Sequence, residues 1–301
     1  ERGYHGMNIG GISVGGMIAN RKTFANILMP NVHHIRHTHL EENKFVRGEP
    51  ESGAELANDL ERIAMNIGPE NIAACIVEPI AGSTGTLVPP KGYLTRLREI
   101  CDKHGILLIF DEVITGWGRT GKTFGADSFN VTPDILTMAK AMTNGVMPMG
   151  AVASREDIYD TIINASPKGT VEFFHGYTYS AIPACVAAAL AMQDIFDKEK
   201  LIDRASEMSS YFLDGLFSLK DIDIISDIRG YGMMGGIDIY MDERPGKSGY
   251  AVFKKLFEAG LSLKATGDCL IVAPPFISEK KHIDEIIEKL RIGITTYKKT
   301  N

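Results

Sequence analysis

The sequence predicts an α/β fold in which a mostly parallel sheet is covered by helices, followed by a smaller C-terminal α+β domain. Strand segments that are apolar on both faces indicate a parallel sheet, and amphipathic helices between them supply its covering layers. After about Pro183 this alternation gives way to longer helices and shorter strands. We therefore expect a large domain over residues 1–190 and a small domain over residues 191–301.

The first half of the chain shows the alternation most clearly. Leucine and isoleucine recur at helical spacing in residues 56–67, and Gly68-Pro69 stops that run. A second amphipathic helix is expected over residues 94–105. The apolar segments expected to form strands are 71–80, 106–110, 134–138 and 149–153. Strands and helices that alternate in this way favour a sheet with helices on both faces.

The second half contains helices whose apolar residues lie on one face, separated by short strands. The expected helices are 184–196, 205–216 and 283–294. The expected strands lie around 222–225, 233–240 and 269–273. This mixture predicts the smaller α+β domain.

Composition excludes several classes of partner. The 301 residues include 32 Lys and Arg against 38 Asp and Glu, a net charge of −6, whereas nucleic acids and anionic membranes require a basic face. No apolar run is long enough to cross a bilayer, and the first residues show no signal-peptide pattern. The four cysteines are widely spaced without a Cys-x-x-Cys pair, which favours a reducing compartment. We expect a soluble cytoplasmic protein.

Three polar residues follow predicted strands, where open parallel sheets bind their ligands. Glu78 and Asp111 end the first two strands, and Lys140 follows the third. Apolar neighbours around Lys140 should lower the pKa of its amine and make it available for Schiff-base chemistry. A pyridoxal phosphate (PLP) enzyme also needs a carboxylate at the pyridine nitrogen, and Asp111 is the candidate. Because neighbouring strand residues point to opposite faces, Glu112 cannot share that crevice.

Other interpretations of these residues remain open on spacing alone. A lysine with apolar neighbours often extends to the surface, and an aspartate at a strand end often caps a helix or a turn.

Four motifs together resemble the class III (fold type I) PLP-dependent aminotransferases, in order and in spacing. They are Ile-Val-Glu78-Pro-Ile-Ala-Gly, Leu-Ile-Phe-Asp111-Glu-Val-Ile-Thr-Gly-Trp-Gly-Arg-Thr-Gly, Thr-Met-Ala-Lys140-Ala-Met-Thr-Asn-Gly and His-Gly-Tyr-Thr178-Tyr-Ser. The resemblance covers essentially the whole chain. It is closest to the ω-amino acid–pyruvate (β-alanine–pyruvate) branch, through residues 2–6, 11–16 and 266–268.

This resemblance implies a role for individual residues. Lys140 looks like the Schiff-base lysine that also moves the substrate proton, and Asp111 looks like the partner of the pyridine nitrogen. The cofactor ring should lie between Val113 and an aromatic side chain near the start of the chain. The remaining cofactor-binding residues that the resemblance implies are Tyr4, which supplies that aromatic ring, His5, Glu78 and Thr178.

Thr178 also bears on the partners of the chain. It resembles a residue that reaches the phosphate of the neighbouring subunit's cofactor. The resemblance therefore implies a homodimer or a tetramer, with shared active sites.

The chain departs from the family pattern in two places. Family members are longer at the amino end, where they carry a phosphate-binding loop at a helix N-terminus. Lys264 stands where this branch typically has an arginine that contacts the substrate carboxylate, and lysine pairs only as a point charge. This change favours a plain amine or a sulfonate donor.

The function expected from these observations is a PLP-dependent transaminase that moves an amino group from an ω-amino acid or amine to a keto acid, with pyruvate as the acceptor. Two alternatives share this fold: a truncated, non-catalytic subunit, and another class III PLP enzyme such as a γ-aminobutyrate or ornithine aminotransferase or an aminomutase.

Two further patterns suggest other chemistry. Gly11-Ile-Ser13-Val-Gly15 matches the nucleophile elbow of serine hydrolases, but a good strand does not precede it, and a glycine-rich helix start or loop is favoured. Four histidines lie close together at His33, His34, His37 and His39. Their segment is polar and includes Arg36, which would repel a cation, so we expect no metal site.

Overall fold

The computed structural model describes residues 1–171, 173–240 and 244–298, which form two four-stranded sheets. The first sheet has the order β1-β2-β3-β4 and the second has the order β5-β6-β8-β7. In the first sheet β1 to β3 are parallel and β4 is antiparallel, and the second sheet is antiparallel throughout. The mostly parallel sheet and the separate α+β unit are therefore confirmed. The strands are β1 (Ala74–Val77), β2 (Leu107–Asp111), β3 (Ile135–Met138), β4 (Ala151–Ser154), β5 (Ile225–Tyr231), β6 (Met234–Ile239), β7 (Lys264–Thr266) and β8 (Cys269–Val272).

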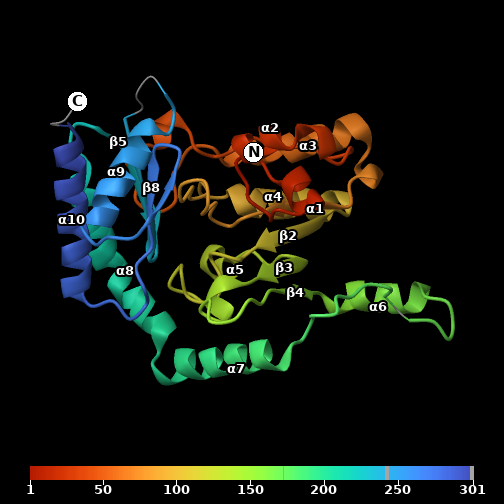
Figure 1. The fold of residues 1–301 in the computed structure, drawn as a ribbon. Helices are drawn as coiled ribbons and strands as arrows, with labels where there is room; N and C mark the ends of the chain where they lie inside the picture. The colour runs from red at the N-terminus through yellow and green to blue at the C-terminus, as the bar shows by residue number, and fades with distance from the viewer. Residues whose placement is uncertain (172, 241–243, 299–301) are drawn as a thin grey trace.

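Helices pack against both sheets (Figure 1). The α-helices are α1 (Ile9–Val14), α2 (Ile18–Thr23), α3 (Asn58–Ile67), α4 (Tyr93–His104), α5 (Gly125–Phe129), α6 (Glu156–Ala165), α7 (Pro183–Lys198), α8 (Leu201–Phe217), α9 (Lys247–Glu258) and α10 (Lys280–Lys298). The short 3-10 helices are η1 (Ala25–Ile27), η2 (Glu41–Asn43), η3 (Ala54–Ala57), η4 (Pro69–Asn71), η5 (Lys140–Met142) and η6 (Ser218–Asp221). None of the described helices combines the length and apolar character that a membrane span requires.

We call the part of the chain built on the β1–β4 sheet the first unit and the part built on the β5–β8 sheet the second unit. The core of the first unit lies between its sheet and the pair α3 and α4. Leu97 and Ile100 of α4 pack without exposed surface against Leu108 and Phe110 of β2. Helix α4 ends at Gly105, whose φ of +68° is the left-handed conformation that glycine adopts easily. The strong helical spacing in the sequence is thus explained by burial of one helix face.

The core of the second unit lies between its sheet and α8, α9 and α10, which Figure 1 shows together on the left. Phe212 and Leu216 of α8, Ile237 of β6, Leu270 of β8 and Ile294 of α10 are buried in one cluster.

Contacts between the two units include a small apolar cluster. Ile80 and Val88 from the first unit pack with Met234 of β6. Helix α7 runs from the first unit towards α8 (Figure 1). The predicted boundary at residue 190 falls inside α7, so its position stays a prediction.

The second unit differs from the sequence prediction in its strands and helices. The strand expected around 222–225 is instead β5, over 225–231, and β7 and α9 were not predicted. Strand β5 is mostly buried, but it contains Asp227 and Arg229. These two charged residues interrupt the apolar pattern by which a buried strand is recognised in a sequence. Strand β7 has only three residues, too few for an alternating pattern.

Candidate active site

Lys140 begins η5, immediately beyond the carboxyl end of β3. Its φ of +46° is unusual for a residue with a side chain, and such backbone strain is concentrated at functional sites. Desolvation lowers the pKa of its amine, opposed by the charges of Asp111 and Glu78 and assisted by the charge of Lys264. The three other charged groups therefore lie close enough to Lys140 to act on it.

Asp111 is the last residue of β2, the strand next to β3. It is buried, and its backbone pairs in register with Thr137 of β3, three residues before Lys140. Its Oδ2 lies 2.8 Å from Nδ1 of His5, whose side chain is also buried. Its Oδ1 accepts a hydrogen bond of 3.1 Å from the backbone N–H of Val113. These contacts fix the carboxylate at the strand end.

Glu78 follows the end of β1, on the other side of β2. Its Oε1 accepts from the backbone N–H of Tyr4 and its Oε2 from that of Gly82, both at 2.9 Å. Burial raises the pKa of this carboxyl to about 7, although both N–H donors and His5 oppose the shift. Glu78 thus brings the segment with Tyr4 and His5 to the ends of the parallel strands.

The Glu112 side chain has different hydrogen-bond partners from those of its neighbour Asp111. Its carboxylate accepts hydrogen bonds from the Thr115 hydroxyl at 2.5 Å and from the backbone N–H groups of Gly125 and Ala126, both at 2.7 Å. Burial raises the pKa of Glu112. This carboxylate holds the loop after β2 and the start of α5, and makes none of the contacts that surround Asp111.

Lys264 comes from the second unit, at the start of β7. Its Nζ donates to the backbone oxygen of Ser83 at 3.4 Å. The turn between β7 and β8 is held by Asp268, whose carboxylate accepts from the backbone N–H groups of Gly246 at 2.7 Å and Gly249 at 2.9 Å. Strand β7 was missed in the sequence, but the Thr-Gly-Asp motif marks the turn that positions it.

Thr178 lies apart from these residues. It is exposed in the segment between α6 and α7, which Figure 1 shows extending away from the body of the molecule. Among the described residues, none of the hydrogen bonds joins Thr178 to the site. One chain therefore brings together Tyr4, His5, Glu78, Asp111, Val113, Lys140 and Lys264, without Thr178.

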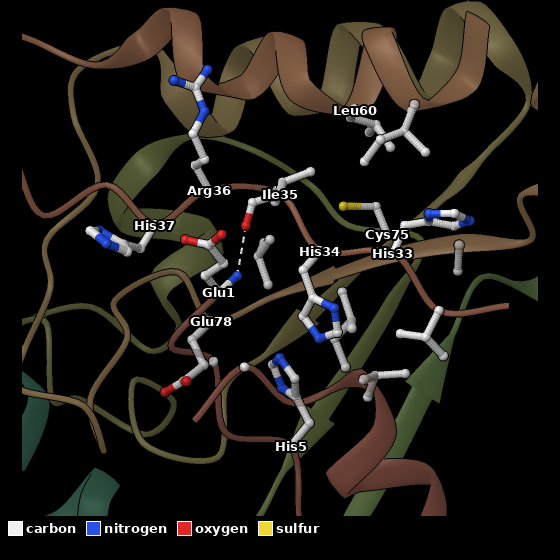
Figure 2. A pocket seen from close by; sticks show the side chains of 18 of the residues that line it. Glu1, His5, His33, His34, Ile35, Arg36, His37, Leu60, Cys75 and Glu78 are labelled. Atoms are coloured by element: carbon white, nitrogen blue, oxygen red, sulfur yellow. Dashed lines mark hydrogen bonds between the residues drawn. The ribbon is translucent and has the colours of Figure 1, made fainter. Parts of the chain in front are cut away.

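A cavity with a volume of about 750 Å³ lies beside this site. Figure 2 shows His5 and Glu78 in its wall, together with His33, His34 and His37. Strand β1 is an edge strand among the described residues and forms one side of the cavity, and α3 forms another. Asp111 and Lys140 are absent from the described residues that line it, so the cavity shares only one edge with the candidate site.

The two other sequence patterns find structural explanations. Ser13 is buried within α1, where its hydroxyl donates to Ile9 O at 2.6 Å and accepts from Met29 N at 2.8 Å. Its glycine-rich motif forms a helix and not a nucleophile elbow. Among the described residues, His39 is the one clustered histidine in a possible metal-ligand group, with Asp227 and Asp238. The Arg229 guanidinium forms ion pairs with both of those aspartates, so it takes the place that a cation would have between them.

Sequence reasoning missed the contacts that join the two units. Arg119, in the loop after β2, donates to the backbone oxygens of Met233 at 2.9 Å and Pro274 at 2.7 Å. Arg229 of β5 donates through Nε to Gly85 O at 2.8 Å. The partners are separated by 114 to 155 residues, so local patterns do not reveal them.

Comparison with known proteins gives a consistent assignment. The family model "Aminotransferase class-III" matches residues 1–293. The chain is 50% identical to an omega-aminotransferase of Caulobacter vibrioides, covering 97% of this chain and 66% of that protein. It is 45% identical to a beta-alanine–pyruvate aminotransferase of Pseudomonas aeruginosa, covering 95% of this chain and 64% of that protein. The chain thus spans just under two thirds of the length of these relatives.

Solved structures agree with the fold. An omega transaminase from Pseudomonas jessenii in complex with PMP matches 99% of this chain and 67% of its own, with a TM-score of 0.91 and 29% identity. A structure described as a transaminase with L-ala matches all of this chain and 72% of its own, with a TM-score of 0.91 and 31% identity. The chain belongs to the class III aminotransferase family, whose cofactor is pyridoxal 5'-phosphate.

Proposed function

We propose that this chain carries most of a PLP-dependent transaminase that moves an amino group from an ω-amino acid or amine to a keto acid, with pyruvate as the acceptor. The observation that carries the proposal is the position of Lys140 directly after β3, next to the strand end that holds the buried carboxylate of Asp111. The Lys140 side chain is partly exposed in this chain, and desolvation lowers the pKa of its amine. The beta-alanine–pyruvate aminotransferase at 45% identity supports the choice of substrates.

The residues present fit pyridoxal phosphate. Its aldehyde reacts with an uncharged amine, and desolvation favours that form of Lys140. Its ring nitrogen pairs with a carboxylate, and Asp111 is buried at the adjacent strand end with Oδ2 held by His5. When bound, this cofactor withdraws electrons from the carbon that carries the amino group. Val113 and Tyr4 would lie against the ring, since Val113 N binds Asp111 and Tyr4 N binds Glu78.

The protein's own groups would divide the work of proton transfer and orientation. As a free amine, Lys140 would take the proton from the carbon that carries the donor's amino group, hold it at Nζ, and return it on the other side of the transferred nitrogen. His5 would hold the Asp111 carboxylate in one orientation, at 2.8 Å. Glu78, whose pKa burial raises to about 7, would change its charge near neutral pH and so adjust the charge beside Lys140.

Lys264 would bind the acid group of the donor. It is exposed, and its charge acts on Lys140 from the second unit. An ammonium binds a carboxylate or a sulfonate as a point charge. We therefore include amines with either acid group among the donors, and a donor without an acid group would not use this contact.

The first test is the attachment of the cofactor to Lys140. Treating the wild-type protein with pyridoxal phosphate and borohydride should attach the cofactor to the peptide that contains Lys140, as read by mass spectrometry. Lys140→Ala should abolish both that attachment and turnover. Lys91→Ala, at an exposed position paired with Glu51, is the control and should retain both. Turnover by the Lys140→Ala protein would refute the assignment.

We further infer a homodimer in which Thr178 of one copy reaches the cofactor phosphate of the other, because Thr178 is exposed and, within the described part of the chain, forms no hydrogen bond to its own site. We also infer a cytoplasmic location, because all four cysteines are free and buried, as is typical of a reducing compartment. Cell fractionation tests the location, and enrichment outside the cytoplasm would contradict it.

A further inference from the structure

The loop of residues 82–86 lies between the two units and beside the candidate site. It is closed by two hydrogen bonds between Ala81 and Leu87, of 3.1 and 3.0 Å. Gly85 has a φ of +124° and Thr86 a φ of +57°, so the turn requires unusual backbone conformations at adjacent residues. A loop of this kind keeps its shape only when its surroundings hold it.

The first unit holds one end of the loop and the second unit holds the rest. Gly82 N donates to Glu78 Oε2 at 2.9 Å. From the second unit, Lys264 Nζ donates to Ser83 O and Arg229 Nε donates to Gly85 O at 2.8 Å. The 82–86 loop therefore links the carboxyl beside Lys140 to the lysine proposed to bind the donor's acid group.

Arg229 is a buried and rigid anchor for this loop. Its guanidinium pairs with Asp227 at 2.5 Å and with both carboxylate oxygens of Asp238 at 2.8 and 2.9 Å. Asp227 in turn accepts from Phe45 N at 2.6 Å. The planar guanidinium donates in fixed directions, so these pairs fix the direction of the Nε–H bond to Gly85 O.

Strand β6 adds a steric constraint on the same loop. A Cβ placed on Gly236 would overlap the backbone oxygen of Gly85, which has no flexible side chain to move away. A Cβ on the adjacent Gly235 would instead meet the Leu216 side chain of α8, inside the second unit. Neighbouring glycines of one strand thus face different elements, and only Gly236 faces the loop.

We propose that Arg229 and Gly236 are positioning residues for donor selection, because they fix the 82–86 loop and thereby place Lys264 against the acid group of the donor. This inference rests on the proposed transaminase function. The physical reason is that Lys264 has a long, flexible side chain, and the carbonyl of Ser83 restrains its ammonium. A displaced loop removes that restraint, which weakens acid-bearing donors more than plain amines.

The test compares kcat/KM for β-alanine and for propylamine, with pyruvate as the acceptor. Gly236→Ala should lower the ratio of the two values by about tenfold, because small displacements of positioning groups have large effects. Gly235→Ala, the matched control, should keep the wild-type ratio even if it lowers stability. Lys264→Met removes the ammonium altogether and should give the lowest ratio of the two kcat/KM values. A general loss of activity acts on both donors and leaves the ratio unchanged.

A second measurement is independent of turnover. Hydrogen exchange of the amides in residues 82–87 should be about tenfold faster in Gly236→Ala, because their hydrogen bonds open more often, and unchanged in Gly235→Ala. Arg229→Lys adds no atom that overlaps the loop, keeps the charge beside Asp227 and Asp238, and loses the directed Nε–H bond. It should change exchange and the donor ratio in the same direction.

The outcomes separate this inference from the proposed function. An unchanged donor ratio with unchanged loop exchange in both Gly236→Ala and Arg229→Lys would overturn the positioning role. Equal effects in Gly235→Ala and Gly236→Ala would also overturn it. If the wild-type enzyme transfers no amino group from any donor, the transaminase proposal fails, and the exchange data still decide whether Arg229 and Gly236 hold the loop.

Discussion

At the scale of single residues, Glu78 shows how burial becomes a pH dependence. Its pKa rises from 4.5 to about 7, with burial as the largest cause. Below pH 4.5 the carboxyl is protonated in both the folded and the unfolded chain. As the pH rises towards 7, the unfolded chain releases this proton first, so the free energy of unfolding falls by about 3 kcal/mol across the window. We expect Glu78→Gln to remove that loss.

The measurement is urea unfolding of the cofactor-free wild type and Glu78→Gln at several pH values from about 4.5 to about 8. The variant should gain stability relative to the wild type as the pH rises, and the difference should level off above about pH 7. Glu42→Gln, at an exposed position, is the control for the loss of one carboxylate. Parallel stability curves for wild type and Glu78→Gln would contradict the shifted pKa.

The sequence could identify Glu78, Asp111 and Lys140 because each follows a recognisable strand. Their catalytic and cofactor-binding roles stay predictions. Arg229 and Ser83 could not be found in the same way, because their contacts join segments far apart in the chain. The charge of Arg229 also argues against the buried strand in which it lies. Contacts of this kind become visible only when the strands are placed in space.

At the scale of elements, the loop after β2 joins the two units through Arg119. Burial lowers the pKa of its guanidinium to about 10. Arg119 donates to Met233 O and Pro274 O, and its guanidinium carbon lies 4.3 Å from the centre of the Phe276 ring. We expect Arg119→Met to lower the free energy of unfolding by about 2–4 kcal/mol, because two carbonyls lose a charged donor. Urea unfolding measures this change.

Trp117 provides a local signal for the same variant. It is the only tryptophan in the sequence, and its ring lies 5.3 Å from that of Phe124 and 6.4 Å from that of Phe196 in α7. Its emission should shift to longer wavelength in Arg119→Met as the loop separates from the second unit. Arg204→Met is the control, because Arg204 also donates to two carbonyls but joins two segments within the second unit. Equal Trp117 emission in both variants would exclude an inter-unit role for Arg119.

Elements were predictable where one face of a helix or both faces of a strand are buried. Helices α3 and α4 and strand β2 follow this rule and match the predicted segments closely. Strands β1, β3 and β4 also match predicted segments, although β1 and β3 are only partly buried and β4 is mostly exposed. Helix α6 has no buried residue in this chain and was not predicted. The short β7 depends on its neighbour β8 and on the Asp268 contacts with the start of α9, which are long-range features.

At the scale of the whole molecule, the segment between α6 and α7 presents an apolar surface. Phe173, Phe174, Tyr177 and Tyr179 are exposed, with Phe174 at 96%. Apolar side chains gathered in this way are typical of protein–protein contacts, and we propose that the interface of the inferred homodimer lies there. Phe174→Asp should convert the dimer to monomers in sedimentation velocity. Phe257→Asp, at an exposed phenylalanine of α9, should remain dimeric. A Phe174→Asp dimer would move the interface elsewhere.

Shared active sites make a sharper prediction than the oligomeric state alone. If Thr178 serves the site of the other copy, Lys140→Ala disables the site of its own subunit, whereas Thr178→Ala disables the site of the other subunit. A mixed dimer contains one site that lacks both residues and one site that retains both. Random pairing of equal amounts of the two proteins should therefore leave about a quarter of all active sites intact. Turnover of the two proteins, unfolded together and refolded, is compared with the sum of their separate activities. A mixture no more active than that sum would show that Thr178 does not act across the interface.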